Sequence, residues 1–154
     1  LVDASTPAAQ SALEDFYQQW KGEPLALNLW FRAQATAPSA TPAVVRQLLA
    51  HSDFTLTNPN KVRSVIAAFC MVNHSQFHSQ DGAGYQLLSE VVGQLNTINP
   101  QIAARLVTPL TGWKKFAQPY SEQMHESLQR IASLPELAKD IAEQVGRSLS
   151  VDES

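Results

Sequence analysis

Hydrophobic residues recur with a helical period along most of the chain. The clearest stripe has apolar side chains at i, i+3, i+4, i+7 and i+8, and consists of Val62, Val65, Ile66, Phe69 and Cys70. This spacing buries one side of a helix. Similar stripes are formed by Leu88, Val91, Val92 and Leu95; by Met124, Leu128, Ile131 and Leu134; and by Leu137, Ile141, Val145 and Leu149. No segment of useful length alternates apolar and polar residues with β-branched enrichment, so the pattern predicts an all-α fold.

Prolines mark where the helices begin. Pro7, Pro24, Pro42 and Pro59 follow one another at separations of 17, 18 and 17 residues, each at the start of an apolar-periodic segment. Proline suits the first helical position because its missing N–H would be unpaired there and its fixed φ is helical. We therefore expect about eight helices, at residues 7–20, 24–35, 42–51, 59–71, 84–97, 100–107, 119–133 and 135–149.

The regular spacing of these starts favours stacked helical hairpins. One helix-turn unit every 17 or 18 residues gives a hairpin about every 35 residues, which is within the range of helical-repeat proteins. The repeat is poor at the level of individual residues, so a compact bundle is the alternative. We predict a HEAT-like α-superhelix, with residues 1–154 forming a single domain.

Composition narrows the possible partners and compartment. The net charge of −3 gives no electrostatic reason to expect a nucleic-acid or acidic-membrane surface. No apolar run approaches the roughly 20 residues that span a bilayer. Cys70 is the single cysteine, so no intrachain disulfide can form, and it fits the apolar stripe as a small core residue. We expect a cytoplasmic protein without nucleic-acid or membrane partners.

Motifs for catalysis or metal binding are missing from the sequence. There is no His-Glu-x-x-His helix and no Gly-x-Ser-x-Gly elbow. His74 and His78 are four residues apart, but no third ligand of convincing spacing accompanies them. Gly82 and Gly84 form a Gly-x-Gly pair with no preceding strand, which indicates a turn and not a phosphate loop. The residues therefore predict a binding or supporting domain with no catalytic residue, metal ligand or cofactor of its own.

Two similar helix starts carry the candidate binding residues. Arg63 follows Asn58-Pro59, whereas Gln101 and Arg105 follow Asn99-Pro100. Arginine near a helix N-terminus is disfavoured by the macrodipole, so both arginines are expected to occupy mildly unfavourable helix positions. Stacked repeats would bring Arg63, Gln101 and Arg105 to one concave surface, where guanidinium and amide groups could bind a carboxylate. The alternative is solvated charge on a helix flank.

Longer strings in the chain resemble a known family. The segments 58–64 (NPNKVRS), 77–85 (FHSQDGAGY) and 99–106 (NPQIAARL) resemble the carboxy-terminal domain of bacterial aminopeptidase N. Upstream, the segments 16–20 (FYQQW) and 30–36 (WFRAQAT) fit the same family, and the resemblance covers about residues 13–149. Lys61 is a departure, because the family often carries Arg there; Lys keeps the charge but loses the planar fork.

The resemblance implies a role within a larger enzyme. Such enzymes are zinc aminopeptidases of the thermolysin-like class, which remove N-terminal residues from peptides, and their His-Glu-x-x-His motif lies in an upstream catalytic domain. Their carboxy-terminal HEAT-like superhelix closes over the active-site cavity. The implied partners are the catalytic domain of the same polypeptide and peptide substrates. By position in the matching motifs, Arg63, Gln101 and Arg105 are carried over as cavity-facing residues, whereas zinc belongs to the catalytic domain.

A different class of function is the alternative. A free-standing helical-repeat module that binds protein segments in its groove would show the same helical pattern. An independent hydrolase has no motif to support it. If the chain is separated from a larger enzyme, it exposes apolar surface that the enzyme covers, and we expect weak self-association.

Overall fold

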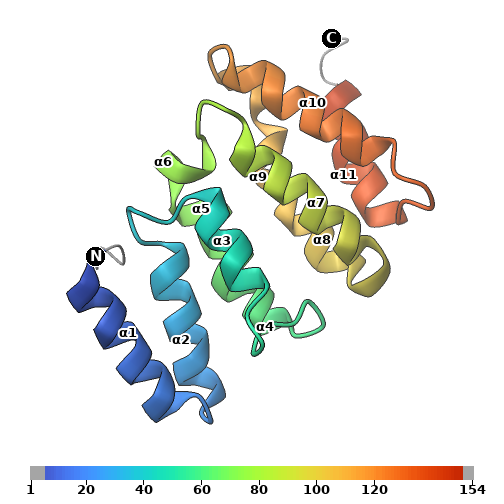
Figure 1. The fold of residues 1–154 in the computed structure, drawn as a ribbon. Helices are drawn as coiled ribbons and strands as arrows, with labels where there is room; N and C mark the ends of the chain where they lie inside the picture. The colour runs from blue at the N-terminus through green and yellow to red at the C-terminus, as the bar shows by residue number, and fades with distance from the viewer. Residues whose placement is uncertain (1–5, 151–154) are drawn as a thin grey trace. The chain divides into compact units, whose positions relative to one another are not determined.

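The computed structural model describes residues 6–150, and every regular element in this range is helical (Figure 1). The predicted all-α class is therefore confirmed. Contacts between Cα atoms divide the chain into two compact units, unit 1 (Leu1–Phe77) and unit 2 (His78–Ser154). That residues 1–154 form a single domain stays a prediction.

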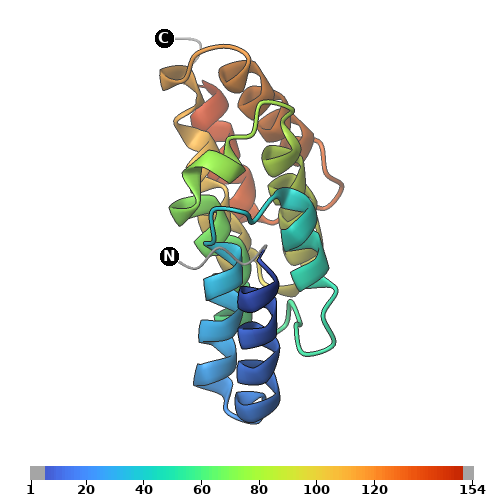
Figure 2. The same ribbon diagram turned by 60° about the vertical axis from the view of Figure 1, so that its left-hand side comes forward.

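Unit 1 follows the predicted helices closely. It contains α1 (Pro7–Trp20), α2 (Pro24–Ala35), α3 (Pro42–Leu49), a continuous run of α4 (Pro59–Val62), the π-helical turn η1 (Arg63–Ala67) and α5 (Ala68–Val72), and the short α6 (His74–Phe77). The helices α1 and α2 lie side by side in both views (Figures 1 and 2). The sequence pattern did not predict the π turn or α6.

Polar side chains before three of the prolines cap the helices. The Thr6 side chain accepts a hydrogen bond from Ala9 N at 3.1 Å, and the Thr41 side chain accepts one from Val44 N at 3.3 Å. Asn58 Oδ1 accepts from two backbone N–H groups, those of Asn60 and Lys61. These bonds satisfy donors that the first turn of a helix leaves without partners.

The core of unit 1 lies between α2 and the run from α4 to α5. Phe31, Val65, Ile66 and Phe69 are fully buried there. Asn73, which follows α5 and is 6% exposed, donates hydrogen bonds of 3.0 Å to the carbonyl oxygens of Ala35 and Ala37. Because these carbonyls end α2 and begin the next loop, one buried amide connects α5 to α2.

Unit 2 begins with the long helix α7 and ends with the long helices α10 and α11, with shorter elements between α7 and α10. The elements are α7 (Ala83–Ile98), α8 (Pro100–Leu106), α9 (Thr108–Thr111), the 3-10 turn η2 (Trp113–Lys115), α10 (Tyr120–Ala132) and α11 (Lys139–Ser150). The core side chains come from α7, α8, α10 and α11 and include Leu88, Val92, Leu95, Ala103, Met124, Leu128, Ile131, Ile141 and Val145.

Tyr85, in the first turn of α7, is buried, and its hydroxyl is hydrogen-bonded to His78 Nδ1 at 2.5 Å. Burial raises the pKa of Tyr85 to about 12, and the charge of Tyr120 adds to this effect.

The last predicted helix starts later than the sequence pattern suggests. We expected it at residues 135–149, with Pro135 as its first residue, but α11 begins at Lys139. The preceding backbone is held by Asn96 of α7: its Nδ2 donates to Glu136 O at 3.1 Å, and its Oδ1 accepts from Ala138 N at 2.7 Å. Glu136 has φ of +55°, a left-handed conformation that cannot continue a right-handed helix. A tertiary contact therefore replaces the first predicted turn.

Candidate functional site

Arg63 lies at the start of the π turn in unit 1, on the exposed side of its helical run. Its guanidinium donates to Asn60 Oδ1 at 3.2 Å, one turn earlier. Its neighbours Val62 and Ser64 are buried, and Ser64 Oγ donates to Asn60 O at 2.7 Å. The Lys61 ammonium lies 5.7 Å from the ring centroid of buried Phe31, within cation–π range. Lys61 is thus partly engaged with the core, whereas Arg63 points its charge toward solvent.

Gln101 and Arg105 lie one turn apart on α8, in unit 2. Both are exposed, whereas Ile102, Ala103 and Leu106 are buried on the opposite side of the helix. Within residues 6–150, no hydrogen bond or ion pair joins either the Gln101 amide or the Arg105 guanidinium to another side chain. Both residues therefore lie on the exposed side of α8.

The expected helix position of Arg105 was wrong. We expected both arginines near the positive end of a helix, at an electrostatic cost. However, α8 is only seven residues long, and Arg105 falls in its last turn. A cation is favoured there, because the macrodipole is negative at that end. The helix position of Arg105 therefore gives no reason to infer an anionic partner.

The three predicted site residues are divided between the two units. Arg63 belongs to unit 1, and Gln101 and Arg105 belong to unit 2, where they form a pair on one flank of α8. The convergence of all three on one surface stays a prediction.

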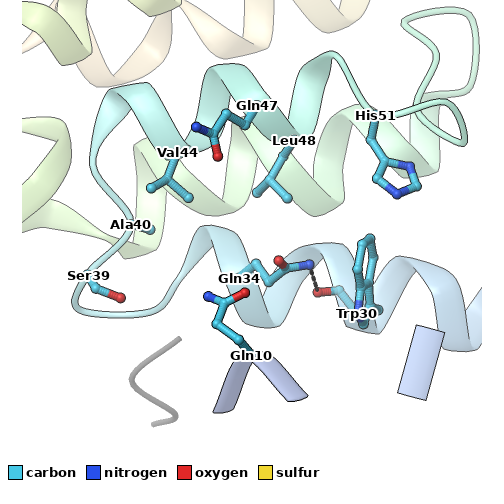
Figure 3. Close-up of a pocket in the computed structure, with 9 residues that line it drawn as sticks. All are labelled: Gln10, Trp30, Gln34, Ser39, Ala40, Val44, Gln47, Leu48 and His51. Carbon is cyan, nitrogen blue, oxygen red and sulfur yellow. Dashed lines mark hydrogen bonds between the residues drawn. The ribbon is translucent and has the colours of Figure 1, made fainter. Parts of the chain in front are cut away.

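A polar pocket in unit 1, the glutamine pocket, was not predicted from the sequence. It has a volume of about 280 Å³ and lies among α1, α2 and α3 (Figure 3). Its walls consist of Gln10, Trp30, Gln34, Ser39, Ala40, Val44, Gln47, Leu48 and His51. Three amides from three helices can donate and accept hydrogen bonds, so the pocket can hold a neutral polar group such as a peptide unit. The pocket lining includes no Asp, Glu, Lys or Arg side chain.

His51 is fixed at one side of the glutamine pocket by its neighbours. Its Nδ1 accepts a hydrogen bond from Asp53 N at 3.0 Å, which leaves the proton of the neutral ring on Nε2. The ring meets the rings of Tyr17, Trp30 and Phe31 edge-on, with centroid distances of 5.1–5.5 Å. The Tyr17 hydroxyl donates to the Asp53 carboxylate, and this bond is the main cause that raises the pKa of Tyr17.

An apolar groove lies on the other side of Trp30, between α1 and α2. It has a volume of about 360 Å³ and is lined by Ala9, Ala12, Leu13, Phe16, Leu29, Trp30 and Ala33. Leu29 is 65% exposed, and Phe16, Trp20 and Leu25 are also exposed on these two helices. These side chains are apolar surface that a partner could cover, and the expected weak self-association stays a prediction.

Residues that could bind zinc or act as a nucleophile are not grouped in the described part of the chain. Among residues 6–150, no three His, Cys, Asp or Glu side chains are placed to hold one metal ion. Zinc therefore does not fit the residues in this part of the chain. Cys70 is buried, which confirms it as a core residue, and burial raises the pKa of its thiol above the ordinary value. None of the described helices combines the length and the apolar character needed to span a bilayer.

Comparison with known proteins defines the family. The sequence matches, over residues 1–150, the family described as "Domain of unknown function (DUF3458_C) ARM repeats". The chain therefore belongs to this family of ARM-repeat domains. The ARM-repeat description agrees with the predicted class of α-superhelix.

The relatives are bacterial aminopeptidases. The chain is 37% identical to aminopeptidase N of Escherichia coli over 150 residues, which are 97% of the chain and 17% of that protein. It is 36% identical to aminopeptidase N of Caulobacter vibrioides over 91% of the chain and 16% of that protein. A crystal structure of Legionella pneumophila aminopeptidase A in complex with aspartic acid has a TM-score of 0.87 and 36% identity, covering 99% of the chain and 18% of that protein. The resemblance to the carboxy-terminal domain of aminopeptidase N is thus confirmed, and the chain spans about a sixth of the length of these curated relatives.

Proposed function

We propose that this chain is the non-catalytic carboxy-terminal domain of a zinc-dependent aminopeptidase, that it closes the active-site cavity, and that it contacts the peptide substrate. The observation that carries the proposal is the match of nearly the whole chain to about a sixth of several aminopeptidases, at 36–37% identity. In this proposal the zinc ion and the catalytic residues belong to the rest of the polypeptide. The relatives are named aminopeptidase N and aminopeptidase A, so the proposal commits to the reaction class and not to the preferred N-terminal residue.

The proposed contact with substrate uses Arg105, with Gln101 and Arg63 as further candidates. A guanidinium stays charged at any physiological pH, and its planar fork matches the two oxygens of a carboxylate. Among the described residues Arg105 has no carboxylate partner, so its donors are available. Gln101, one turn earlier on the same flank, can add an amide donor. Arg63 begins a π turn, a feature frequent at functional sites in helices.

The proposal is tested by kcat/KM of the full-length enzyme that contains this chain. Arg105→Ala is assayed on matched short peptides with a free or an amidated carboxyl end. Loss of a charge-assisted hydrogen bond costs about 1.5–3 kcal/mol, so we expect at least a roughly ten-fold decrease in kcat/KM for the free acid only.

Arg32→Ala is the matched control, because Arg32 is also exposed and also lies in the last turn of its helix. We expect this variant to leave both substrates unchanged. An equal loss on both peptides, or no loss on either, would show that Arg105 does not bind the far end of the substrate.

The second candidate function is a free-standing protein-interaction module. The glutamine pocket and the apolar groove of unit 1 favour it, because both could bind a protein segment without an enzyme. Sequencing the gene upstream of Leu1 separates the two candidates. An in-frame His-Glu-x-x-His motif followed by a downstream Glu supports the aminopeptidase, whereas its absence supports the module.

A further inference from the structure

A third cavity, which we term the α7–α10 cavity, lies wholly within unit 2. It has a volume of about 200 Å³ and is formed by α10 and by the start of α7 with the residues just before it; the two helices lie side by side (Figure 1). Its lining is almost entirely polar and consists of Asp81, Gly82, Gln86, Gln123, Glu126, Ser127 and Arg130. None of these residues belongs to the proposed substrate contact, and nothing in this inference rests on the aminopeptidase assignment.

One buried group in this cavity lacks a hydrogen-bond partner in the part of the chain that the structure describes. The Gln123 side chain donates from Nε2 to Gln80 O at 2.9 Å, which directs its Oε1 elsewhere, and this buried oxygen accepts no hydrogen bond. Ser127 is 3% exposed and also lines the cavity. Because buried polar groups are normally hydrogen-bonded, the Gln123 oxygen without a partner indicates a ligand that donates.

Glycine at position 82 lets Gln123 take this position. Gly82 has φ of +74°, and a Cβ atom there would lie 3.2 Å from Gln123 Cδ. A side chain at position 82 would be strained and would press on the Gln123 amide.

Charges of both signs surround the cavity without pairing. Asp81 Oδ1 accepts from Ala83 N at 3.0 Å and from Ser79 Oγ at 2.9 Å, and these bonds lower the pKa of Asp81, which keeps it ionised. Glu126 and Arg130 are i, i+4 neighbours on α10, the usual spacing of a helical ion pair. Yet no ion pair within 4.0 Å joins Arg130 to Glu126 or to Asp81 in residues 6–150.

We propose that the α7–α10 cavity binds a small α-amino acid in its zwitterionic form. An α-ammonium group has three donors, which suit Gln123 Oε1, the Ser127 hydroxyl and an acidic side chain. The α-carboxylate suits the guanidinium of Arg130. At about 200 Å³ the cavity is smaller than the roughly 300–1,000 Å³ typical of drug-sized ligands, so only a small ligand fits.

The test is an NMR titration of the full 154-residue chain with glycine, following the Gln123 side-chain amide and the Ser127 and Gly82 backbone amides. Methylamine supplies the ammonium alone, acetate the carboxylate alone, and glycine betaine both charges without N–H donors. We expect glycine to bind at least roughly ten-fold more tightly than any of the three. Because the charged groups are at the exposed rim, Glu126→Gln and Arg130→Gln should each weaken glycine binding about three- to five-fold.

Glu122→Gln is the control variant, since Glu122 is an exposed carboxylate on the same helix that does not line the cavity. It should leave glycine binding unchanged. Equal binding of glycine and methylamine, tighter binding of calcium ions than of glycine, or no change at the reporter signals would each overturn the proposal; the last result would mean that the cavity holds only water. Because the readout is binding and not turnover, failure here leaves the kinetic test of Arg105 unaffected.

Discussion

The two Asn-Pro helix starts share a sequence motif, but they place their arginines in opposite electrostatic settings. After Asn58-Pro59 the chain stays helical to Val72, so Arg63 lies in the first half of a long run. After Asn99-Pro100 the helix ends at Leu106, so Arg105 lies in the last turn. The comparison teaches that a capping motif determines where a helix begins, whereas its length decides whether the macrodipole opposes or favours a given cation.

The largest expected difference between the two helices is in the unfolding free energy lost when a buried isoleucine is truncated. Ile66 is fully buried, whereas Ile102 is 8% exposed. Ile66→Ala should reduce the free energy of unfolding by about 2–5 kcal/mol, and Ile102→Ala should fall at the lower end of this range, because a partly exposed site leaves a smaller cavity. Urea unfolding followed by circular dichroism measures both. Ile→Val at each position is the conservative control, with an expected loss of about 0.5–1.5 kcal/mol, and an equal cost for the two alanine variants would contradict the comparison.

Removal of the two N-cap side chains should show a smaller difference in unfolding free energy. Asn58 Oδ1 accepts from two backbone N–H groups, at 3.0 and 3.3 Å, whereas Asn99 Oδ1 accepts from Ile102 N alone, at 3.3 Å. Asn58→Ala should therefore cost about 1–2 kcal/mol and Asn99→Ala about 0.5–1 kcal/mol in unfolding free energy. Serine at each position should restore most of the loss in the same urea experiment. If the Asn99 cap proved the more costly to remove, the count of capping bonds would not explain the difference.

The smallest expected difference in unfolding free energy is between variants of the two arginines. Arg105→Gln removes a cation from the end of a helix where the dipole favours it, at a cost of about 0.3–1 kcal/mol at low salt. Arg63→Gln removes no such interaction, and its unfolding free energy should stay within about 0.5 kcal/mol of the parent. Unfolding at low salt and in 1 M NaCl measures the distinction, since screening should remove the Arg105 effect. If Arg63→Gln, and not Arg105→Gln, lowered the unfolding free energy in a salt-dependent way, the two arginines would have been assigned to the wrong electrostatic settings.

Local sequence patterns were sufficient for the fold class and for most helix boundaries. Pro7, Pro24, Pro42 and Pro59 each begin a helix, because proline geometry acts within a few residues, as do the side-chain caps that precede all of these prolines except Pro24. The start of α11 could not be predicted in the same way. It depends on Asn96, which lies about 40 residues earlier in the chain and holds the backbone at Glu136 and Ala138.

The candidate binding residues could be identified from the sequence, whereas the two polar cavities could not. The family resemblance identified Arg63, Gln101 and Arg105 from short matching strings, and their exposure agrees with a position on helix flanks. The two polar cavities had no signal in the sequence. Gln123 looks like an ordinary polar residue of an amphipathic helix, and the lack of a partner for its Oε1 becomes visible only when α7 packs against α10.

The π turn at Arg63–Ala67 also bears on how this chain should be aligned with its relatives. The backbone N–H of Ala68 bonds to Arg63 O, which spans five residues where an α-helix spans four. The turn thus behaves as a one-residue insertion that the helix absorbs locally. Val62 before it and Phe69 after it are both fully buried, so the packing continues on either side. A single-residue gap in this segment of a related sequence would therefore mark a change of turn type, with the buried faces on both sides retained.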